Sequence, residues 1–226
     1  MPAYAHLSTI VLATGNPHKV DELRAIFADA GIKGVRFLGL KDVPAHTVEP
    51  HETGSTFADN ATIKALSYAQ QTGLPALADD SGLEIDALQG RPGVISSHYY
   101  NEGHDDGKPR EQRDGLNNAR ILRELEGVPP EQRSARFVCV MALALPNSPI
   151  PAALTRGTFE GRIGTPPHVP RGHNGFGYDP LFLVAPDFHL TSAELPKDQK
   201  NALSHRAHAA KAMAHEIAQL LRGPHG

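Results

Sequence analysis

Apolar residues recur along this chain with helical spacing in some segments and strand spacing in others. Leu7 to Ala13 is a short run of β-branched and apolar residues that predicts a buried strand, whereas Val20 to Ala30 has helical spacing. Thr56 to Gln71 predicts a second helix that ends at Gly73, and Ser204 to Arg222 predicts a long amphipathic helix. The chain therefore begins as strand, loop and helix, and it closes on a helix.

Strand patterns dominate the middle of the chain. Ser134 to Leu145 is the most continuous apolar run, and Leu154 to Ile163 alternates between apolar and polar residues. Pro75 to Asp79 and Leu83 to Leu88 are two short apolar segments. Asp80-Ser81-Gly82 separates them and has the composition of a turn, so we expect the carboxylates there to lie at a strand end.

Three further segments complete the pattern. Val35 to Leu38 has the composition of another strand, Arg113 to Glu126 predicts a helix, and Gly164 to Pro180 predicts a long loop rich in proline and glycine. A loop of that length in a compact domain is usually functional or mobile. Because no repeat or linker divides the chain, we expect residues 1–226 to form a single α/β domain with a central mixed, twisted sheet flanked by helices.

Composition narrows the function classes. The formal net charge of −3 provides no basic footprint for long nucleic acid, and no stretch is apolar enough for a membrane span. The start of the chain lacks the pattern of a signal peptide, and the single cysteine, Cys139, lies in an apolar run typical of a buried thiol. The 13 histidines are scattered, which does not favour a transition-metal site. We therefore expect a soluble cytoplasmic protein.

The segment Thr14-Gly15-Asn16-Pro17-His18-Lys19 follows the first predicted strand and begins the first predicted helix. Backbone N–H groups at such a position point at anions, and Lys19 adds a positive charge. Gly15 permits close approach, and Pro17 suits the first helical position. The segment does not have P-loop spacing, so it predicts either a phosphate-binding loop or a turn that only caps a helix.

Two sets of carboxylates are candidates for metal and proton chemistry. Asp79 and Asp80 follow an apolar strand, and we assign the chemistry to Asp80 and an orienting role to Asp79; an Asx-turn is the structural alternative. Glu52 precedes a helix on which Asn60 and Lys64, four residues apart, share a face. Glu52 is suited to be a second oxygen ligand for Mg²⁺, whereas Lys64 by itself is typical of an exposed lysine.

Two later segments are candidates for base recognition. Gly175-Phe176-Gly177-Tyr178-Asp179-Pro180 places an aromatic ring between glycines, where it can stack on a base or plug the core. Lys200 to Arg206 presents Lys200, His205 and Arg206 at the predicted entry to the last helix, with Ser204 as its cap. These groups suit a phosphate or a purine carbonyl oxygen, or they are exposed cations of a capping segment.

The order of these motifs resembles the non-canonical purine NTP pyrophosphatases, also called the HAM1-like family. The resemblance covers about Ile10 to Leu221 and rests on five separated motifs: Thr14-Gly15-Asn16 with Lys19; Glu52-Thr53-Gly54 with Asn60 and Lys64; Asp79-Asp80-Ser81-Gly82; Gly175 to Pro180; and Ser204-His205-Arg206. It implies a two-lobed α/β fold with an active-site cleft between the lobes. It also implies a homodimer and Mg²⁺-dependent hydrolysis of ITP, dITP and XTP to the monophosphate and pyrophosphate, which removes these nucleotides before incorporation into DNA or RNA.

The resemblance also implies roles for individual residues. Asp80 would accept the proton and bind Mg²⁺ together with Glu52. The nucleotide would be bound by a larger set, namely Thr14, Gly15, Asn16, Pro17, His18, Lys19, Ser81, Phe176, Gly177, Tyr178, Asp179, Lys200, His205 and Arg206. Selectivity would rest on donors near Lys200 and His205 that read the six-keto group of the base.

This chain departs from the family pattern at one position. After Pro92-Gly93-Val94 the family usually has Ser-Ala-Arg-Tyr, whereas this chain has Ser96-Ser97-His98-Tyr99, with His98 in place of the arginine. Two other functions remain open: a pyrophosphatase of related fold that acts on other nucleotides, such as modified pyrimidines, and a noncatalytic nucleotide-binding regulator. The intact Asp79-Asp80 pair and Glu52 argue against the regulator.

Overall fold

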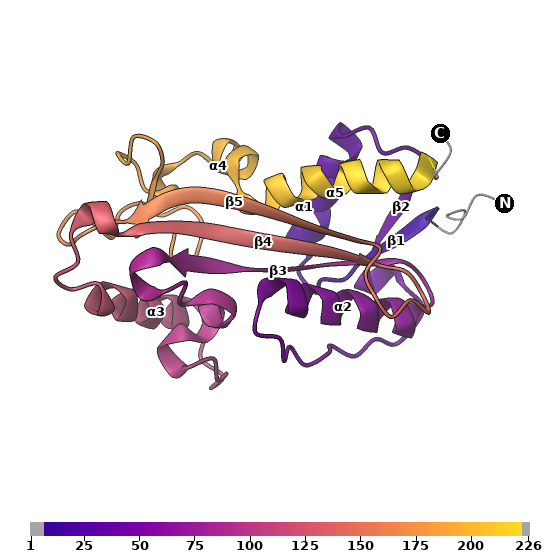
Figure 1. The fold of residues 1–226 in the computed structure, drawn as a ribbon, viewed down its shortest axis with the longest axis horizontal. Helices are drawn as coiled ribbons and strands as arrows, with labels where there is room; N and C mark the ends of the chain where they lie inside the picture. The colour runs from indigo at the N-terminus through magenta and orange to yellow at the C-terminus, as the bar shows by residue number, and fades with distance from the viewer. Residues whose placement is uncertain (1–6, 223–226) are drawn as a thin grey trace. The chain divides into compact units, whose positions relative to one another are not determined.

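The computed structural model describes residues 7–222 and contains a six-stranded mixed sheet (Figure 1). The strand order is β2-β1-β3-β4-β5-β6; β1 pairs with β2 and β3 in parallel, and β5 pairs with β6 antiparallel. The strands are β1 Thr9–Leu12, β2 Arg36–Gly39, β3 Ala76–Ile85, β4 Ser134–Ala144, β5 Ala153–Ile163 and β6 Phe182–Val184. The helices are α1 Pro17–Asp29, α2 Phe57–Thr72, α3 Arg110–Glu124, α4 Lys197–Leu203 and α5 His205–Arg222. The predicted α/β class with a mixed sheet is confirmed.

The chain divides into two compact units that share the three long strands. Among the described residues, unit 1 comprises 7–80, 139–157 and 206–222, and unit 2 comprises 81–138 and 158–205. The boundaries fall inside β3, β4 and β5, so each of these strands contributes one part to each unit. The expectation of one domain with two lobes stays a prediction. No helix between residues 7 and 222 is both long and apolar enough to cross a bilayer.

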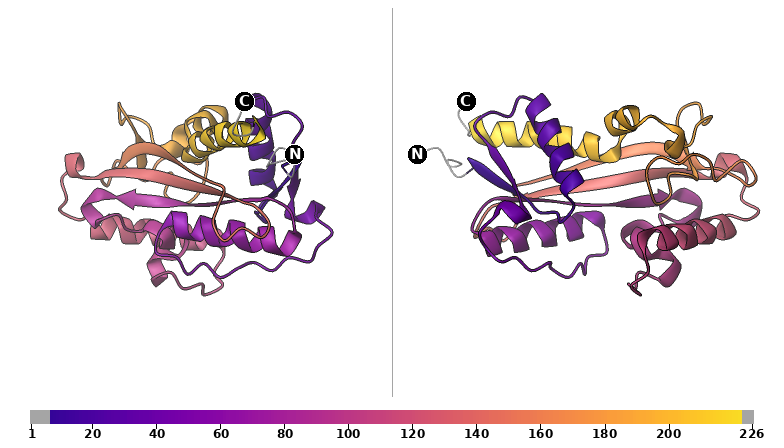
Figure 2. Two further views of the ribbon diagram at one scale, coloured as in Figure 1. Left: turned by 45° about the vertical axis from the view of Figure 1, so that its right-hand side comes forward. Right: turned by 180° about the vertical axis from the view of Figure 1, so that it is seen from behind.

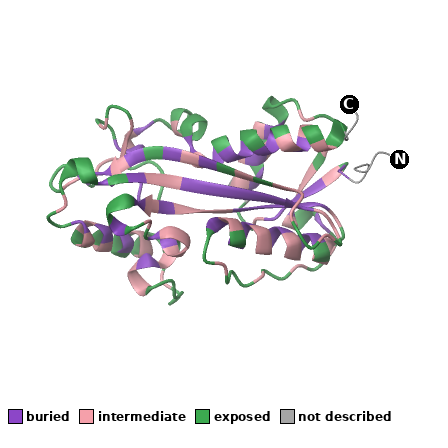
Figure 3. Ribbon diagram, in the orientation of Figure 1, coloured by how far each residue is buried: buried purple, intermediate pink, exposed green. Residues whose placement is uncertain are grey.

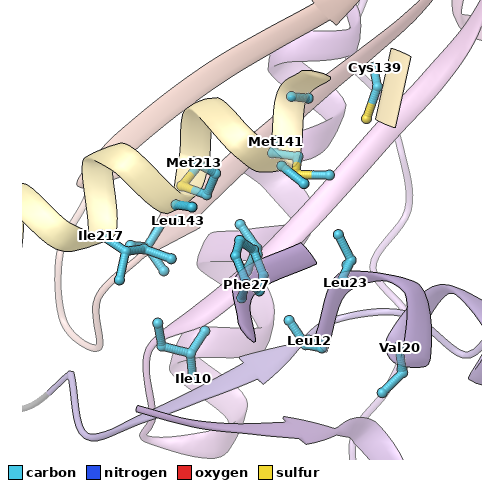
Figure 4. Packing of buried hydrophobic residues seen from close by; sticks show 14 of the residues in the cluster. Ile10, Leu12, Val20, Leu23, Phe27, Cys139, Met141, Leu143, Met213 and Ile217 are labelled. Atoms are coloured by element: carbon cyan, nitrogen blue, oxygen red, sulfur yellow. The ribbon is translucent and has the colours of Figure 1, made fainter. Parts of the chain in front are cut away.

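Unit 1 packs α1 and α5 against one face of its strands, and α2 lies on the other face (Figures 1 and 2). Its core joins Phe27 of α1 and Met213 of α5 to Leu12 and Met141 on the strands, and all four side chains are fully buried (Figure 4). Cys139 lies in the same cluster, so the prediction of a buried thiol is confirmed.

Helix α2 begins and ends where the sequence predicts. The Thr56 hydroxyl accepts a hydrogen bond from the Asp59 N–H, and the Asp59 carboxylate accepts one from the Thr56 N–H, both at 3.1 Å. This reciprocal cap satisfies two N–H groups that the helix cannot satisfy internally. Gly73 follows the last turn with φ of 66°, a left-handed conformation that glycine adopts readily.

Unit 2 has α3 and α4 on opposite sides of its strands (Figures 1 and 2). Its core contains Leu83 and Ile85 of β3, Ile121 of α3 and Phe182 of β6, all fully buried. Figure 3 shows that buried residues are concentrated along the strands, while the helices expose their outer faces.

The predicted turn at Asp80-Ser81-Gly82 is wrong, because β3 runs without interruption through these residues. Gly82 is instead required by close packing: a Cβ atom there would collide with the Ser96 side chain and with the carbonyl oxygen of Gly93. The Ser96 hydroxyl also accepts a hydrogen bond from the Leu83 N–H at 2.9 Å. The glycine therefore permits a neighbouring segment to approach the strand, and it does not reverse the chain.

Two other boundaries differ from the sequence prediction. Lys200 lies in a separate short helix, α4, and not at the entry to α5. Strand β6 lies just beyond the predicted long loop, and its three residues are too few to give a periodic pattern.

Candidate active site

Asp79 and Asp80 contact two separate sets of charged residues in unit 1. Successive residues of a strand point to opposite faces, and no turn brings these two carboxylates together. Asp79 contacts Lys19 and Arg206, whereas Asp80 contacts Lys64. The two adjacent acids therefore have different partners.

Asp79 is a buried carboxylate between two cations. Its Oδ2 lies 3.1 Å from Lys19 Nζ and 3.4 Å from Arg206 Nη2, and only 8% of the residue is exposed. Burial opposes ionisation, but the charges of Lys19 and Arg206 outweigh it and hold the pKa of Asp79 far below its usual value. Arg206 also lies 3.8 Å from Glu22 Oε2. Asp79 thus stays ionised and fixes two cations that come from α1 and α5.

Asp80 is in a different electrostatic environment. Its Oδ1 lies 3.4 Å from Lys64 Nζ, which also lies 3.2 Å from Glu52 Oε1. Burial raises the pKa of Asp80, the Lys64 charge lowers it, and the Glu52 charge raises it again; the net shift is upward. A carboxylate whose pKa is raised toward the operating pH is a better proton acceptor than an ordinary aspartate.

Lys64 is buried between these carboxylates, so it is not the exposed lysine that its segment alone suggests. Burial lowers the pKa of Lys64, but the charges of Asp80 and Glu52 outweigh that effect and the net shift is upward. Its helical neighbour Asn60 hydrogen-bonds Asp80 and also accepts a bond from the Gly54 N–H at 2.8 Å. The spacing of four residues therefore directs both α2 side chains to one acid.

Glu52 and Asp80 provide the carboxylate oxygens that a magnesium ion prefers as ligands. One oxygen of each carboxylate lies within 3.4 Å of Lys64 Nζ, so the two carboxylates are close to each other. Mg²⁺ is commonly held by one or two carboxylates that are supplemented by waters and substrate phosphates. Within residues 7–222 no group of three or more His, Cys, Asp or Glu is arranged to hold a metal ion.

The predicted phosphate-binding loop lies between β1 and α1. The Asn16 N–H donates to Thr14 Oγ1 at 3.2 Å, and the Asn16 carbonyl accepts from the Lys19 and Val20 N–H groups. Helix α1 begins at Pro17, as predicted, and a surface pocket is lined by Thr14 and Gly15 together with residues of α1 and the segment 39–42. The side chains of Pro17 and His18 lie outside the described part of the structure.

The predicted base-recognition segment lies in unit 2. Phe176 is 53% exposed, whereas Tyr178 is buried and its hydroxyl donates to the Ser96 carbonyl oxygen at 2.6 Å. Each of the two sequence-based alternatives therefore fits one residue: Tyr178 fills the core, whereas Phe176 faces outward. Asp179 is buried and accepts hydrogen bonds from the Phe176 N–H at 2.8 Å and from Lys200 Nζ.

The remaining predicted residues do not form one group. His205 belongs to unit 2 and stacks on Phe137 with ring centroids 5.4 Å apart, whereas Arg206 belongs to unit 1 and contacts Asp79. Ser81 follows Asp80 directly on β3 and is half-buried. His98, the departure from the family pattern, contacts Arg113 of α3 through Nε2.

The family model described as the Ham1 family matches residues 10–216, which include every predicted site residue. The chain belongs to the Ham1 family. It is 49% identical over 203 residues to the dITP/XTP pyrophosphatase of Nitratidesulfovibrio vulgaris, covering 89% of this chain and 92% of that protein. It is 42% identical over 217 residues to the dITP/XTP pyrophosphatase of Geobacillus kaustophilus, covering 96% and 98%. The structure of a HAM1 protein from Coxiella burnetii superposes with a TM-score of 0.77 at 41% identity, covering 93% of this chain and 98% of that one.

Sequence reasoning missed two residues that hold the predicted base-recognition segment in place. Asp114 and Asn118 of α3 hydrogen-bond the main chain of Gly177 at 2.8 and 3.0 Å. In the sequence they belong to the polar side of an amphipathic helix, where carboxylates and amides are expected in contact with solvent. Their spacing of four residues was the available signal, but it did not indicate a partner.

Proposed function

We propose that this Ham1-family chain is a Mg²⁺-dependent nucleoside triphosphate pyrophosphatase that converts ITP, dITP and XTP to the monophosphate and pyrophosphate. Two relatives that match at least 89% of the chain are named dITP/XTP pyrophosphatase. The proposal assigns the triphosphate to residues of unit 1 and the base to residues of unit 2.

The observation that carries the proposal is the separation of Asp79 from Asp80 on β3. Asp79 holds Lys19 and Arg206 as fixed positive charges, which can bind phosphate oxygens without reorganisation during the reaction. Asp80 has a raised pKa and accepts a proton from the attacking water. The oxygen of that water forms a bond to phosphorus, and pyrophosphate leaves with the electron pair of the broken P–O bond.

Glu52 and Asp80 are the residues that would hold Mg²⁺. When bound, the ion would neutralise negative charge on the triphosphate and help to orient it. Lys64 lies between the same two carboxylates and keeps them close together despite their mutual repulsion. Positioning and electrostatics dominate this class of chemistry, so a rigid set of charges is the main requirement.

The base would stack on the exposed ring of Phe176, beside Lys200. Lys200 Nζ lies 5.6 Å from the ring centroid and also contacts Asp179. An ammonium in that position can donate to the six-keto group of hypoxanthine or xanthine, whereas the amino group of adenine offers it no acceptor. His205 of unit 2 is a further donor to the base in this proposal, whereas Arg206 stays with Lys19 as a phosphate-binding cation.

A substrate panel tests the reaction and the base preference together. Pyrophosphate release is measured for ITP, dITP, XTP, dUTP and GTP with Mg²⁺. The proposal expects the first three to be cleaved fastest; faster cleavage of dUTP would instead identify a pyrimidine enzyme. Tight nucleotide binding with no pyrophosphate release would identify a regulator.

The role of Asp80 is tested by Asp80→Asn, with Glu84→Gln as the control. Glu84 is an acid on the same strand, and its Oε2 lies 3.8 Å from Arg136 Nη1. Turnover should be abolished in Asp80→Asn while nucleotide binding remains measurable, and Glu84→Gln should keep turnover. Near-normal activity of Asp80→Asn would remove Asp80 from the catalytic role.

Three features complete the proposal on the basis of the family resemblance. They are a homodimer, a cytoplasmic location, and two lobes with an active-site cleft between them. Light scattering of the purified protein tests the dimer, and a monomer at micromolar concentration would contradict it.

A further inference from the structure

The loop that carries Phe176 is tied to α3 through both main-chain hydrogen-bonding groups of Gly177. The Gly177 N–H donates to Asp114 Oδ2 at 2.8 Å, and its carbonyl oxygen accepts from Asn118 Nδ2 at 3.0 Å. Asp114 and Asn118 are four residues apart, so they share one face of the helix. Helix α3 therefore binds both the N–H and the carbonyl oxygen of Gly177.

The loop needs such restraint because of its composition. Gly175 and Gly177 flank Phe176 and have φ values of 81° and 63°, in the region that glycine adopts most readily. Glycine also loses more backbone entropy on ordering than other residues, so an unrestrained Gly-Phe-Gly segment would sample many conformations. The contacts with Asp114, Asn118 and Asp179 remove that freedom.

The same face of α3 reaches the aromatic ring itself. Arg110 is four residues before Asp114, and its guanidinium carbon lies 4.2 Å from the centroid of the Phe176 ring. The ring is 53% exposed although it is large and apolar. Its position is therefore set by the restrained main chain and by this cation, and only partly by burial.

Resting on the proposed function, we propose that Asp114 and Asn118 are positioning residues for base recognition. They hold Phe176 where a purine base stacks, and they do so without contacting the nucleotide. A ring that is already ordered loses little conformational entropy when the base binds, so the restraint increases the affinity for substrate. The contribution should appear in KM more than in kcat, because the reacting groups belong to a different set of residues.

Kinetics of variants test this role. Asp114→Ala removes the acceptor for the Gly177 N–H, whereas Asp114→Asn keeps an acceptor oxygen. Because one charge-assisted hydrogen bond is lost in Asp114→Ala, its KM for dITP and XTP should rise about tenfold. Its kcat should change less than about threefold. Asp114→Asn should have a KM within about twofold of the wild-type value. Asn118→Ala should behave like Asp114→Ala, and Glu111→Gln, at an exposed position of the same helix, is the matched control.

A spectroscopic measurement tests positioning independently of turnover. The chain contains no tryptophan, so Phe176→Trp introduces a single reporter at the ring position. Its steady-state fluorescence anisotropy should fall when Asp114→Ala is added and stay unchanged when Glu111→Gln is added.

The outcomes separate the two proposals. Unchanged KM and unchanged anisotropy in Asp114→Ala overturn the positioning role, as does an equal loss of kcat in Asp114→Ala and Asp114→Asn, which would indicate a structural defect. A wild-type protein that releases no pyrophosphate from dITP or XTP overturns the proposed function, whatever the anisotropy of the reporter.

Discussion

Neutralising Asp79 should lower the stability of the protein, whereas neutralising Asp80 should leave it unchanged or raise it, although the two residues are adjacent on β3. Asp79→Asn removes the charge that compensates Lys19 and Arg206. Asp80→Asn removes a charge that the folded protein disfavours, as the raised pKa of Asp80 indicates. The two substitutions are chemically identical, so any difference arises from the surroundings.

The magnitude for Asp79→Asn follows from the burial of its partners. Removing one partner from a buried ion pair costs about 3–5 kcal/mol, because the other charge stays buried without compensation. Arg206 is 9% exposed and keeps Glu22, while Lys19 can turn toward solvent because 27% of its side chain is exposed. We therefore expect a loss of about 3 kcal/mol in the free energy of unfolding, which lowers Tm by about 6 to 12 °C in a chain of this size.

The expected pH dependence has a definite sign. The pKa of Asp79 is lower in the folded protein than in an unfolded chain, so its stabilising contribution is present above the unfolded value of about 4 and is lost as pH falls through the folded pKa. The pKa of Asp80 is raised, so its ionised form destabilises the fold at neutral pH. Asp80→Asn should therefore leave Tm unchanged or raise it at pH 7.

Thermal unfolding followed by far-UV circular dichroism measures these effects at pH 7 and at pH 2.5, which lies below the unfolded pKa. The difference in Tm between wild type and Asp79→Asn should be smaller at pH 2.5 than at pH 7. If Asp79→Asn unfolds within about 2 °C of wild type at pH 7, the buried ion pair does not contribute as its geometry suggests. If Asp80→Asn loses as much stability as Asp79→Asn, the surroundings of Asp79 and Asp80 do not differ in the way that their opposite pKa shifts indicate.

Two other substitutions test the proposed site, and a thiol reagent tests the core of unit 1. Glu52→Gln should raise the Mg²⁺ concentration needed for half-maximal pyrophosphate release by about tenfold, since one of two proposed protein carboxylates is lost; an unchanged metal titration would exclude Glu52 as a ligand. Gly175→Ala should abolish base-dependent binding, because its Cβ would collide with Asp179 and Lys200 at a positive φ; normal KM for dITP would contradict this. Cys139 is fully buried and its pKa is raised by burial and by neighbouring charge, so a thiol reagent should react with it only after denaturation.

The local elements were predictable because their signals are local. Helix α2 has a cap at Thr56 and a terminating Gly73, and both signals lie in the sequence. Strand β4 has an apolar run long enough to identify it without its neighbours. The order of the motifs along the chain then identified the family, which the family match over residues 10–216 confirms.

The features that the sequence did not predict all depend on contacts between segments that are far apart in the chain. Asp80-Ser81-Gly82 has turn composition, but strand pairing and the packing of Ser96 against Gly82 determine its conformation. The roles of Asp114 and Asn118 depend on Gly177, which lies about 60 residues further along the chain. A period of 3.6 residues identifies the helix face, but it cannot identify what that face contacts.

The continuity of β3 explains how one dipeptide can supply two chemistries. Had the predicted turn been present, both carboxylates could have met the same cations, and their pKa values would have been coupled. In the strand, alternation sends Asp79 to Lys19 and Arg206 and sends Asp80 to Lys64 and Glu52. One acid is thereby held ionised and fixes the two cations that we propose bind phosphate, while the other has a raised pKa, which suits its proposed role as proton acceptor. A substitution that introduced a bulge between residues 79 and 80 would therefore be expected to abolish activity even though every side chain of the site remained.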